Sequence, residues 1–244
     1  MIYSTKGIVL KNINYSESST IVRIFTSRFG LRSYIIKGGR KPKSKLHSNI
    51  FQPLFLLDLQ VYNNPKKDIQ MISDANISTS LSSTFSDIRK ISLAFFLSEI
   101  LNHCIKEEQE NIELYNFLER KILSLNSLEK NFYLFHIFFL LELSEYLGFF
   151  PMNNFSIVEN LFDITKGHYV REYPLHKNCL SKEDSQLFNK FLSYKKQGGK
   201  IEESINISKE ESNKLLDILI LFYETHLIGL NSIKSHKVLS TILH

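Results

Sequence analysis

The chain has 244 residues, of which 43% are hydrophobic and 23% are charged, with nine glycines and five prolines. This balance excludes intrinsic disorder and collagen-like repeats, and two cysteines are too few for a disulfide-stapled miniprotein. The length provides material for one large or two small domains with their own hydrophobic cores. The formal net charge of +5 is modest, so its distribution along the chain is more informative than its sum.

Residues 1–80 show the short alternating runs and turn residues that are typical of β-strands. Five strands are predicted, at residues 7–10, 19–25, 31–37, 54–62 and from 69 onward. Five short strands in about eighty residues are too few for an immunoglobulin sandwich and fit a small closed barrel. The sequence therefore predicts an OB-fold, which is a five-stranded barrel.

From residue 81 the spacing of the apolar residues becomes helical. A first helix is expected to begin at Ser83 or Ser86 and to end near residue 105. Further helices are predicted at residues 113–125, 128–147, 182–196, 209–227 and 232–243. The helix over 128–147 is apolar almost all round, which is typical of a central helix in a bundle. Residues 208–211 form a capping-box signature.

We predict an α+β protein with two domains. Residues 1–80 form the OB-fold domain, which binds nucleic acid, and residues 81–244 form a helical domain. Residues 152–180 contain Gly167 and Pro174 and lack a long helical pattern, so they are expected to form a short irregular insert.

The basic residues concentrate in the first of these domains. Residues 1–80 hold twelve lysines and arginines against four acidic residues, a net charge of +8, whereas the remainder has a net charge of −3. A basic cluster of this kind neutralises phosphates and gains free energy from counterion release, which makes binding salt-dependent. The candidate DNA-binding residues are Arg23, Arg28, Arg32, Lys37, Arg40, Lys41, Lys43 and Lys45.

Aromatic residues interleave with these cations. They are Phe29, Tyr34, Phe51 and Tyr62. On the outside of a barrel they could stack on bases, and the alternative is that they belong to the core. Strand alternation places Arg23 and Arg32 on surfaces that can flank one groove.

The sequence offers no strong catalytic motif. Residues 38–44 superficially resemble a phosphate-binding loop, but no glycine precedes Lys43 and Pro42 removes a backbone donor. We therefore expect no catalytic residue, no enzymatic activity and no cofactor.

Three alternatives stay open at this point. The first is an RNA-binding OB-fold module, because backbone charge attracts both polymers. The second is an enzyme whose site assembles from scattered residues such as His136, Glu142 and Glu145. The third is a protein-only adaptor whose basic loop is simply solvated.

Neither the N-terminus nor the longest apolar run indicates secretion or a membrane span. The first residues lack a basic head followed by a long apolar stretch, so no signal peptide is expected. The run over 132–141 contains His136 and is too short, since about twenty apolar residues are needed to cross a bilayer. Cys104 and Cys179 lie far apart, which favours a reduced cytoplasmic protein.

Several short motifs occur in an order that is similar to one known family. In the N-terminal part they are residues 6–10, 15–17, 24–26 with Gly30, 37–41 with Ser44, and 51–54. In the helical part they are residues 138–141, 147–151, and 223–227 with Ser235 and 238–239. Together they resemble the RecO family of bacterial DNA repair proteins, and the resemblance spans the whole chain.

The resemblance implies an N-terminal OB-fold followed by a helical domain. It implies a recombination mediator that binds single- and double-stranded DNA and anneals complementary strands. With RecR, such a protein helps to load RecA onto DNA covered by single-strand binding protein. The implied location is the cytoplasm, in association with the nucleoid and without a membrane partner.

The resemblance also implies that the acidic C-terminal tail of single-strand binding protein docks on the helical part. A tail of this kind needs a cation beside an apolar pocket. The candidate partner-binding cations are Arg120, Lys121 and Lys130.

Some members of the family hold a zinc ion with four cysteines in the irregular segment. Here residues 152–155 offer no thiol, and only His176 and Cys179 remain at a ligand-like spacing. Two ligands do not make a structural zinc site, so we predict no metal. Apolar residues are then expected to stabilise this segment, among them Leu161, Phe162 and Ile164.

Overall fold

The computed structural model describes residues 1–38, 46–129, 134–196, 207–227 and 233–242. The chain divides into two compact units, residues 1–127 and 128–244. The domain boundary at residue 80 stays a prediction; it lies where the strands give way to helices.

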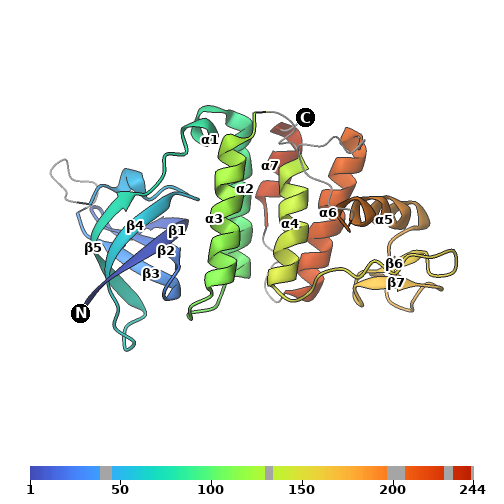
Figure 1. Cartoon of the computed structure of the whole chain (residues 1–244), viewed down its shortest axis with the longest axis horizontal. Helices are drawn as coiled ribbons and strands as arrows, with labels where there is room; N and C mark the ends of the chain where they lie inside the picture. The colour runs from blue at the N-terminus through green and yellow to red at the C-terminus, as the bar shows by residue number, and fades with distance from the viewer. Residues whose placement is uncertain (39–45, 130–133, 197–206, 228–232, 243–244) are drawn as a thin grey trace. The chain divides into compact units, whose positions relative to one another are not determined.

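The first unit contains a closed five-stranded barrel (Figure 1). Its strands are β1 (Ile2–Asn14), β2 (Thr20–Thr26), β3 (Gly30–Ile36), β4 (Leu56–Tyr62) and β5 (Ile69–Ile77). They are ordered β1-β2-β3-β5-β4, and only the β3–β5 pairing is parallel. This arrangement confirms the predicted OB-like barrel.

The alternation of side chains along the strands builds the barrel core. On β2, Val22 and Ile24 are buried inside the barrel, while Arg23 between them faces the other way. Gly7 lies close to its neighbours on β2 and β4, since a Cβ there would come within 2.6 Å of the Ile24 side chain and 2.7 Å of the Leu59 side chain. A larger residue at this position would therefore displace these two core side chains.

Strand β1 is longer than predicted, and β5 begins where predicted. β1 was expected at residues 7–10 and runs over thirteen residues, because it pairs with β4 through its first half and with β2 through its second. β5 continues to Ile77, where its polar residues pair with β4, for example Asn76 with Asp58. Exposed residues, most of them polar, hide the strand pattern at both ends of β1.

Three helices belong to the same unit as the barrel, and the first two occupy the region where one helix was predicted. They are α1 (Ser82–Ser86), α2 (Ile88–Cys104) and α3 (Ile112–Ser127). The predicted helix was expected to begin at Ser83 or Ser86 and to end near residue 105, and α2 agrees with the later start. The chain breaks between α1 and α2 because Asp87 has an extended backbone and its side chain accepts a hydrogen bond from the backbone N–H of Arg89. Asp87 is therefore the N-cap of a new helix.

Helices α1, α2 and α3 pack against the barrel (Figure 1). The Ser98 hydroxyl of α2 donates a hydrogen bond to the Leu10 carbonyl of β1. The rings of Phe25 and Tyr115 lie 6.2 Å apart, and those of Phe55 and Phe85 lie 4.9 Å apart. These contacts make residues 1–127 one packed body.

The second unit is mainly helical and contains a small β-hairpin. Its elements are α4 (Phe135–Tyr146), β6 (Leu161–Asp163), β7 (His168–Val170), α5 (Lys182–Lys196), α6 (Lys209–His226) and α7 (Ser235–Ile242). Every residue from Phe135 to Leu141 is buried, which confirms that α4 is central. The helix begins at Phe135 and not at residue 128, since Leu134 is its N-cap. The capping box at Ser208 and Glu211 is present as predicted.

The irregular insert holds the hairpin of β6 and β7. Leu161, Phe162 and Ile164 are buried there, as expected for a segment stabilised by apolar packing. Among the helices that the structure describes, none is both long and apolar enough to span a membrane.

Candidate nucleic-acid interface

The eight predicted DNA-binding residues fall into two groups. Arg40, Lys41, Lys43 and Lys45 lie outside the described residues. The other four are in the barrel unit, at the β2–β3 turn, on β2 and β3, and directly after β3.

Arg23 and Arg32 are both bonded to the segment that ends α2 and follows it. The Nη1 atom of Arg23 donates to the Asn102 side chain at 2.7 Å, and partial burial lowers the pKa of Arg23. Arg32 donates to the Glu108 carboxylate at 2.5 Å and to the Glu108 backbone carbonyl at 2.7 Å. Both guanidinium groups therefore join the barrel to this segment, and a DNA contact by either stays a prediction.

The acidic segment 106–110 lies directly against the start of β3. The Leu31 N–H donates to the Glu107 carbonyl at 2.9 Å. Gly30 has a φ of 63°, and a Cβ there would lie 2.2 Å from the Gln109 carbonyl oxygen. Only glycine permits both this left-handed backbone and the close approach. Glu107 and Glu108 place negative charge at this edge, and the Glu108 carboxylate is paired with Arg32.

Arg28 is exposed at the β2–β3 turn and lies beside two aromatic rings. Its guanidinium carbon is 4.9 Å from the centre of the Tyr3 ring and 5.5 Å from that of Phe29. The two rings pack edge to face with their centres 5.5 Å apart. Contact with the ring faces holds the cation in place and leaves its N–H groups able to reach a phosphate.

The four aromatic residues singled out from the sequence have different environments. Tyr34 and Phe51 are 1% and 0% exposed and belong to the barrel core, so the base-stacking interpretation was wrong for these two. Phe29 is partly buried beside Tyr3. Tyr62 is 42% exposed at the end of β4 and could reach a base.

Lys37 is exposed just after β3, and two further exposed lysines were not singled out from the sequence. Lys66 and Lys67 lie in the turn between β4 and β5. The signal that could have found them is the turn sequence at 63–65 followed by two adjacent cations. Within the described part of the chain, no ion pair involves any of these three lysines.

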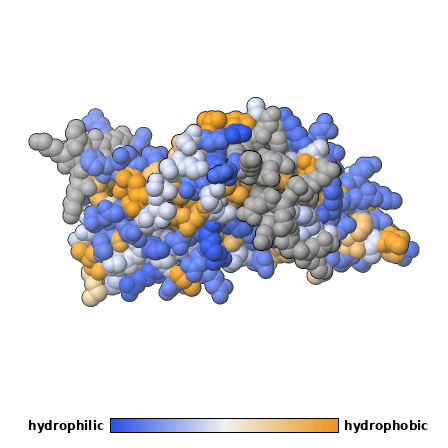
Figure 2. Space-filling model, turned by 45° about the horizontal axis from the view of Figure 1, so that its top comes forward, coloured by the Kyte–Doolittle hydropathy of each residue, from blue (hydrophilic) through white to orange (hydrophobic). Residues whose placement is uncertain are grey.

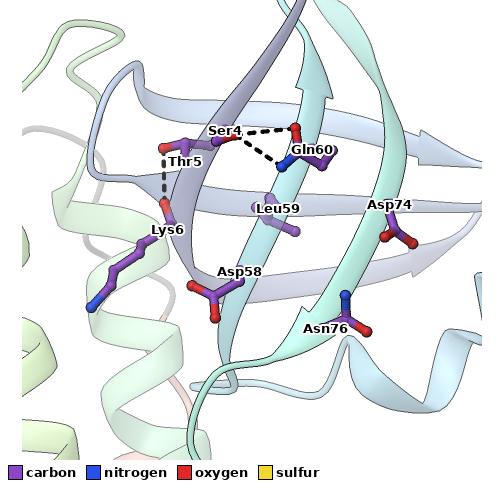
Figure 3. A pocket seen from close by; sticks show the side chains of 8 residues that line it. All are labelled: Ser4, Thr5, Lys6, Asp58, Leu59, Gln60, Asp74 and Asn76. Carbon is purple, nitrogen blue, oxygen red and sulfur yellow. Dashed lines mark hydrogen bonds between the residues drawn. The ribbon is translucent and has the colours of Figure 1, made fainter.

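A second area of the barrel exterior carries the opposite charge. We call it the acidic hollow; it has a volume of about 290 Å³ and lies over β1, β4 and β5 (Figure 3). Asp58 and Asp74 line it together with Lys6, whose Nζ lies 3.1 Å from Glu119 on α3. A phosphate backbone would gain little binding free energy here, because the lysine that lines the hollow, Lys6, is already paired with Glu119.

The candidate partner-binding cations belong to different parts of the chain. Arg120 is exposed on α3, and Lys121 is partly buried with its Nζ 5.9 Å from the centre of the Phe117 ring. Both are in the first compact unit. Lys130 lies outside the described residues.

Several of the residues considered for metal binding and catalysis are buried or make structural contacts. His176 Nε2 lies 3.3 Å from the buried Asp163 carboxylate, whose other oxygen accepts from two backbone N–H groups. Burial raises the pKa of Cys179. The Glu142 carboxylate accepts a hydrogen bond from Lys195, and His136 is buried. No group of three or more possible metal ligands occurs among the residues that were described.

Comparisons with known proteins match both units. The profile described as "Recombination protein O N terminal" matches residues 1–81, and "Recombination protein O C terminal" matches residues 85–235. The chain is 32% identical over 242 residues to a protein of Azobacteroides pseudotrichonymphae named DNA repair protein RecO, with 99% of each chain covered. It is 33% identical to the protein of that name from Flavobacterium psychrophilum, with 98% of each chain covered.

Proposed function

Because this chain belongs to the RecO family of DNA repair and recombination proteins, we propose that it binds single- and double-stranded DNA and anneals complementary strands. With RecR, it helps to load RecA onto DNA covered by single-strand binding protein. The family is one of non-enzymatic recombination mediators, which confirms that the chain is not an enzyme.

The observation that carries the proposal is the order of the two family matches. The N-terminal match covers the whole barrel, and the C-terminal match covers the helices from α2 to the start of α7. The cation excess of residues 1–80 falls within the first match, where a charged polymer is expected to bind.

Annealing by such a surface requires that the negative charge of two strands be screened. Exposed cations such as Arg28 and Lys37 hold the backbones and release counterions, while the bases stay free to pair. The bound strands repel each other less than free strands do, so complementary bases meet more often.

The partners of this activity follow from the same family assignment. RecR and the acidic tail of single-strand binding protein are expected to bind directly, whereas RecA is reached through the DNA. The helical part of the chain offers apolar side chains and cations for the tail, among them Arg120 and Lys121. The protein then works in the cytoplasm on the nucleoid.

The test is annealing of two complementary oligonucleotides, each coated with single-strand binding protein, with and without this protein at two salt concentrations. We expect an acceleration that fades as salt rises. A chain that binds DNA tightly and does not accelerate annealing would contradict the proposal. Tighter binding to single-stranded RNA than to DNA of equal length would instead favour an RNA-binding module.

A further inference from the structure

An apolar row crosses the outside of the barrel at the end of β4. In the strand register Tyr62 lies opposite Ile2 of β1 on one side and Met71 of β5 on the other, and Met71 lies opposite Ile35 of β3. Residues opposite each other in a sheet point to the same face. Ile2, Tyr62 and Met71 are 47%, 42% and 46% exposed, so this face is the outside of the barrel.

The row borders a hollow of about 490 Å³ at the junction of β3 and β5, which we call the β3–β5 hollow. Its lining includes the apolar or aromatic residues Ile35, Tyr62, Ile69 and Met71 and the cations Lys37 and Lys67. Figure 2 shows hydrophobic surface at the left-hand end of the barrel unit. Apolar side chains gathered on the surface of a small domain mark a binding site more often than scattered ones do.

Cations surround the β3–β5 hollow. Lys37 follows Ile35 by two positions, and Lys66 and Lys67 come from the β4–β5 turn. All three are exposed, and one exposed acid, Asp68, lies beside them. A ligand that has both a flat apolar part and negative charge is therefore complementary to the hollow and its rim.

The β4–β5 turn is held in shape by one buried side chain. Gln70 is 4% exposed, and its amide donates to the backbone carbonyls of Asn64 and Lys67 while its oxygen accepts from the Asn64 N–H at 2.8 Å. The two lysines therefore start from a fixed backbone, which lowers the entropy lost when a ligand binds.

We propose that the β3–β5 hollow is a subsite for unpaired bases of single-stranded nucleic acid. A base stacks on the Tyr62 ring and packs against Met71, while the neighbouring phosphates contact Lys37 and Lys67. This inference rests on the proposed DNA binding and names where one part of the strand binds. Stacking on an aromatic ring is independent of sequence, as annealing of arbitrary strands requires.

A strand is favoured over an acidic peptide by the charge around the hollow. Lys37, Lys66 and Lys67 are exposed there, and within the described part of the chain no ion pair involves any of them. A polymer with a negative charge at every unit can contact all three cations, while its bases supply the flat apolar part that the Tyr62 ring and Met71 fit.

The test compares the full-length protein with its Tyr62→Ala and Tyr62→Phe variants by fluorescence anisotropy. The probes are a labelled oligodeoxythymidine and an abasic strand of equal length. We expect Tyr62→Ala to weaken binding of the oligodeoxythymidine about tenfold, since stacking on one aromatic residue has this magnitude. Tyr62→Phe keeps the ring and the affinity. Binding of the abasic strand is the same for all three proteins.

A second variant and a matched control keep the test decisive. Met71→Glu introduces a negative charge into the hollow and should weaken binding at least as much as Tyr62→Ala does. Asp74→Asn, in the acidic hollow on the same strand, should not weaken binding. Thermal melting checks that each variant is folded, and the exposure of Tyr62 and Met71 makes a large loss of stability unexpected.

Three results would overturn the subsite. One is unchanged oligodeoxythymidine affinity in the folded Tyr62→Ala and Met71→Glu variants. Another is an equal loss on the abasic strand. The third is a labelled acidic peptide whose binding depends on Tyr62 while the DNA affinity does not. If the unaltered protein binds no DNA at all, the proposed function fails instead, and the two failures are therefore distinguishable.

Discussion

The two hollows on the barrel exterior share strand β4 and differ in chemistry. The outward residues of β4 are Asp58, Gln60 and Tyr62, so the strand is acidic where it borders the acidic hollow and aromatic where it borders the β3–β5 hollow. Asp74 and Met71 of β5 extend the same change. A small barrel can therefore direct a negatively charged strand to one end of a sheet by changing the residues along a single outward row.

Of the changes proposed here, the largest loss of DNA affinity is expected from reversing the charge of the cations that follow Lys37 in the sequence. Changing Arg40, Lys41 and Lys43 together to glutamate should weaken DNA binding by about 10²-fold and reduce the salt slope by about two. The measurement is DNA affinity across a salt series. Unchanged affinity would remove residues 40–43 from the binding site.

Neutralising the acidic hollow should reduce the difference in charge between the two ends of β4. The double variant Asp58→Asn and Asp74→Asn raises the net charge by two, and we expect about fivefold tighter binding of single strands at low salt. The gain should be equal for abasic and normal strands, because it comes from charge alone. A gain limited to normal strands would show that bases bind in the acidic hollow.

Removing the acid beside Arg32 should have a smaller effect. Glu108→Gln loses the ion pair but keeps the hydrogen bond from Arg32 to the backbone carbonyl of residue 108. Since an exposed ion pair contributes at most about 1 kcal/mol, DNA affinity should rise only about two- to threefold. Weaker binding by this variant would mean that the pair positions Arg32 for DNA.

A carboxylate outside both hollows should affect stability and leave DNA binding unchanged. The hydrogen bond from the Arg89 side chain lowers the pKa of Asp87 to about 2. A lowered pKa means that the ionised form stabilises the fold at neutral pH, and that this contribution is lost as the pH falls from about 4 to 2. Asp87→Asn should lower the melting temperature slightly at pH 7 and by less at pH 2, with DNA affinity unaltered. An equal loss at both pH values would mean that ionisation of Asp87 contributes nothing.

The strand count, the barrel and the central place of α4 could be predicted from the sequence, because alternation and helical spacing are local patterns. The extent of α5 at 182–196 was likewise correct. The start of α2 was left open between Ser83 and Ser86 because the apolar spacing continues through Asp87. Helix capping by an aspartate was the available signal.

The surroundings of the site residues could be predicted less well. Strand alternation correctly placed the Arg23 side chain outside the barrel core. It could not indicate that this side chain would donate a hydrogen bond to Asn102 of α2. In the sequence, Tyr34, Phe51 and Tyr62 are all aromatic residues near cations. Only the three-dimensional structure of the barrel shows that the rings of Tyr34 and Phe51 are buried and that of Tyr62 is exposed. The apolar row depends on the register of four strands, which no single strand determines.

The close contact at Gly30 has a consequence for the order in which the chain can fold during synthesis. The Leu31 N–H donates a hydrogen bond to the carbonyl of Glu107, and the Phe25 ring packs near the ring of Tyr115. When only the five strands have left the ribosome, the residues of segment 106–110 and of α3 that contact the barrel have not yet been synthesised. The first body able to fold completely ends after α3, so truncation at residue 127 should yield a stable fragment and truncation at residue 80 should not.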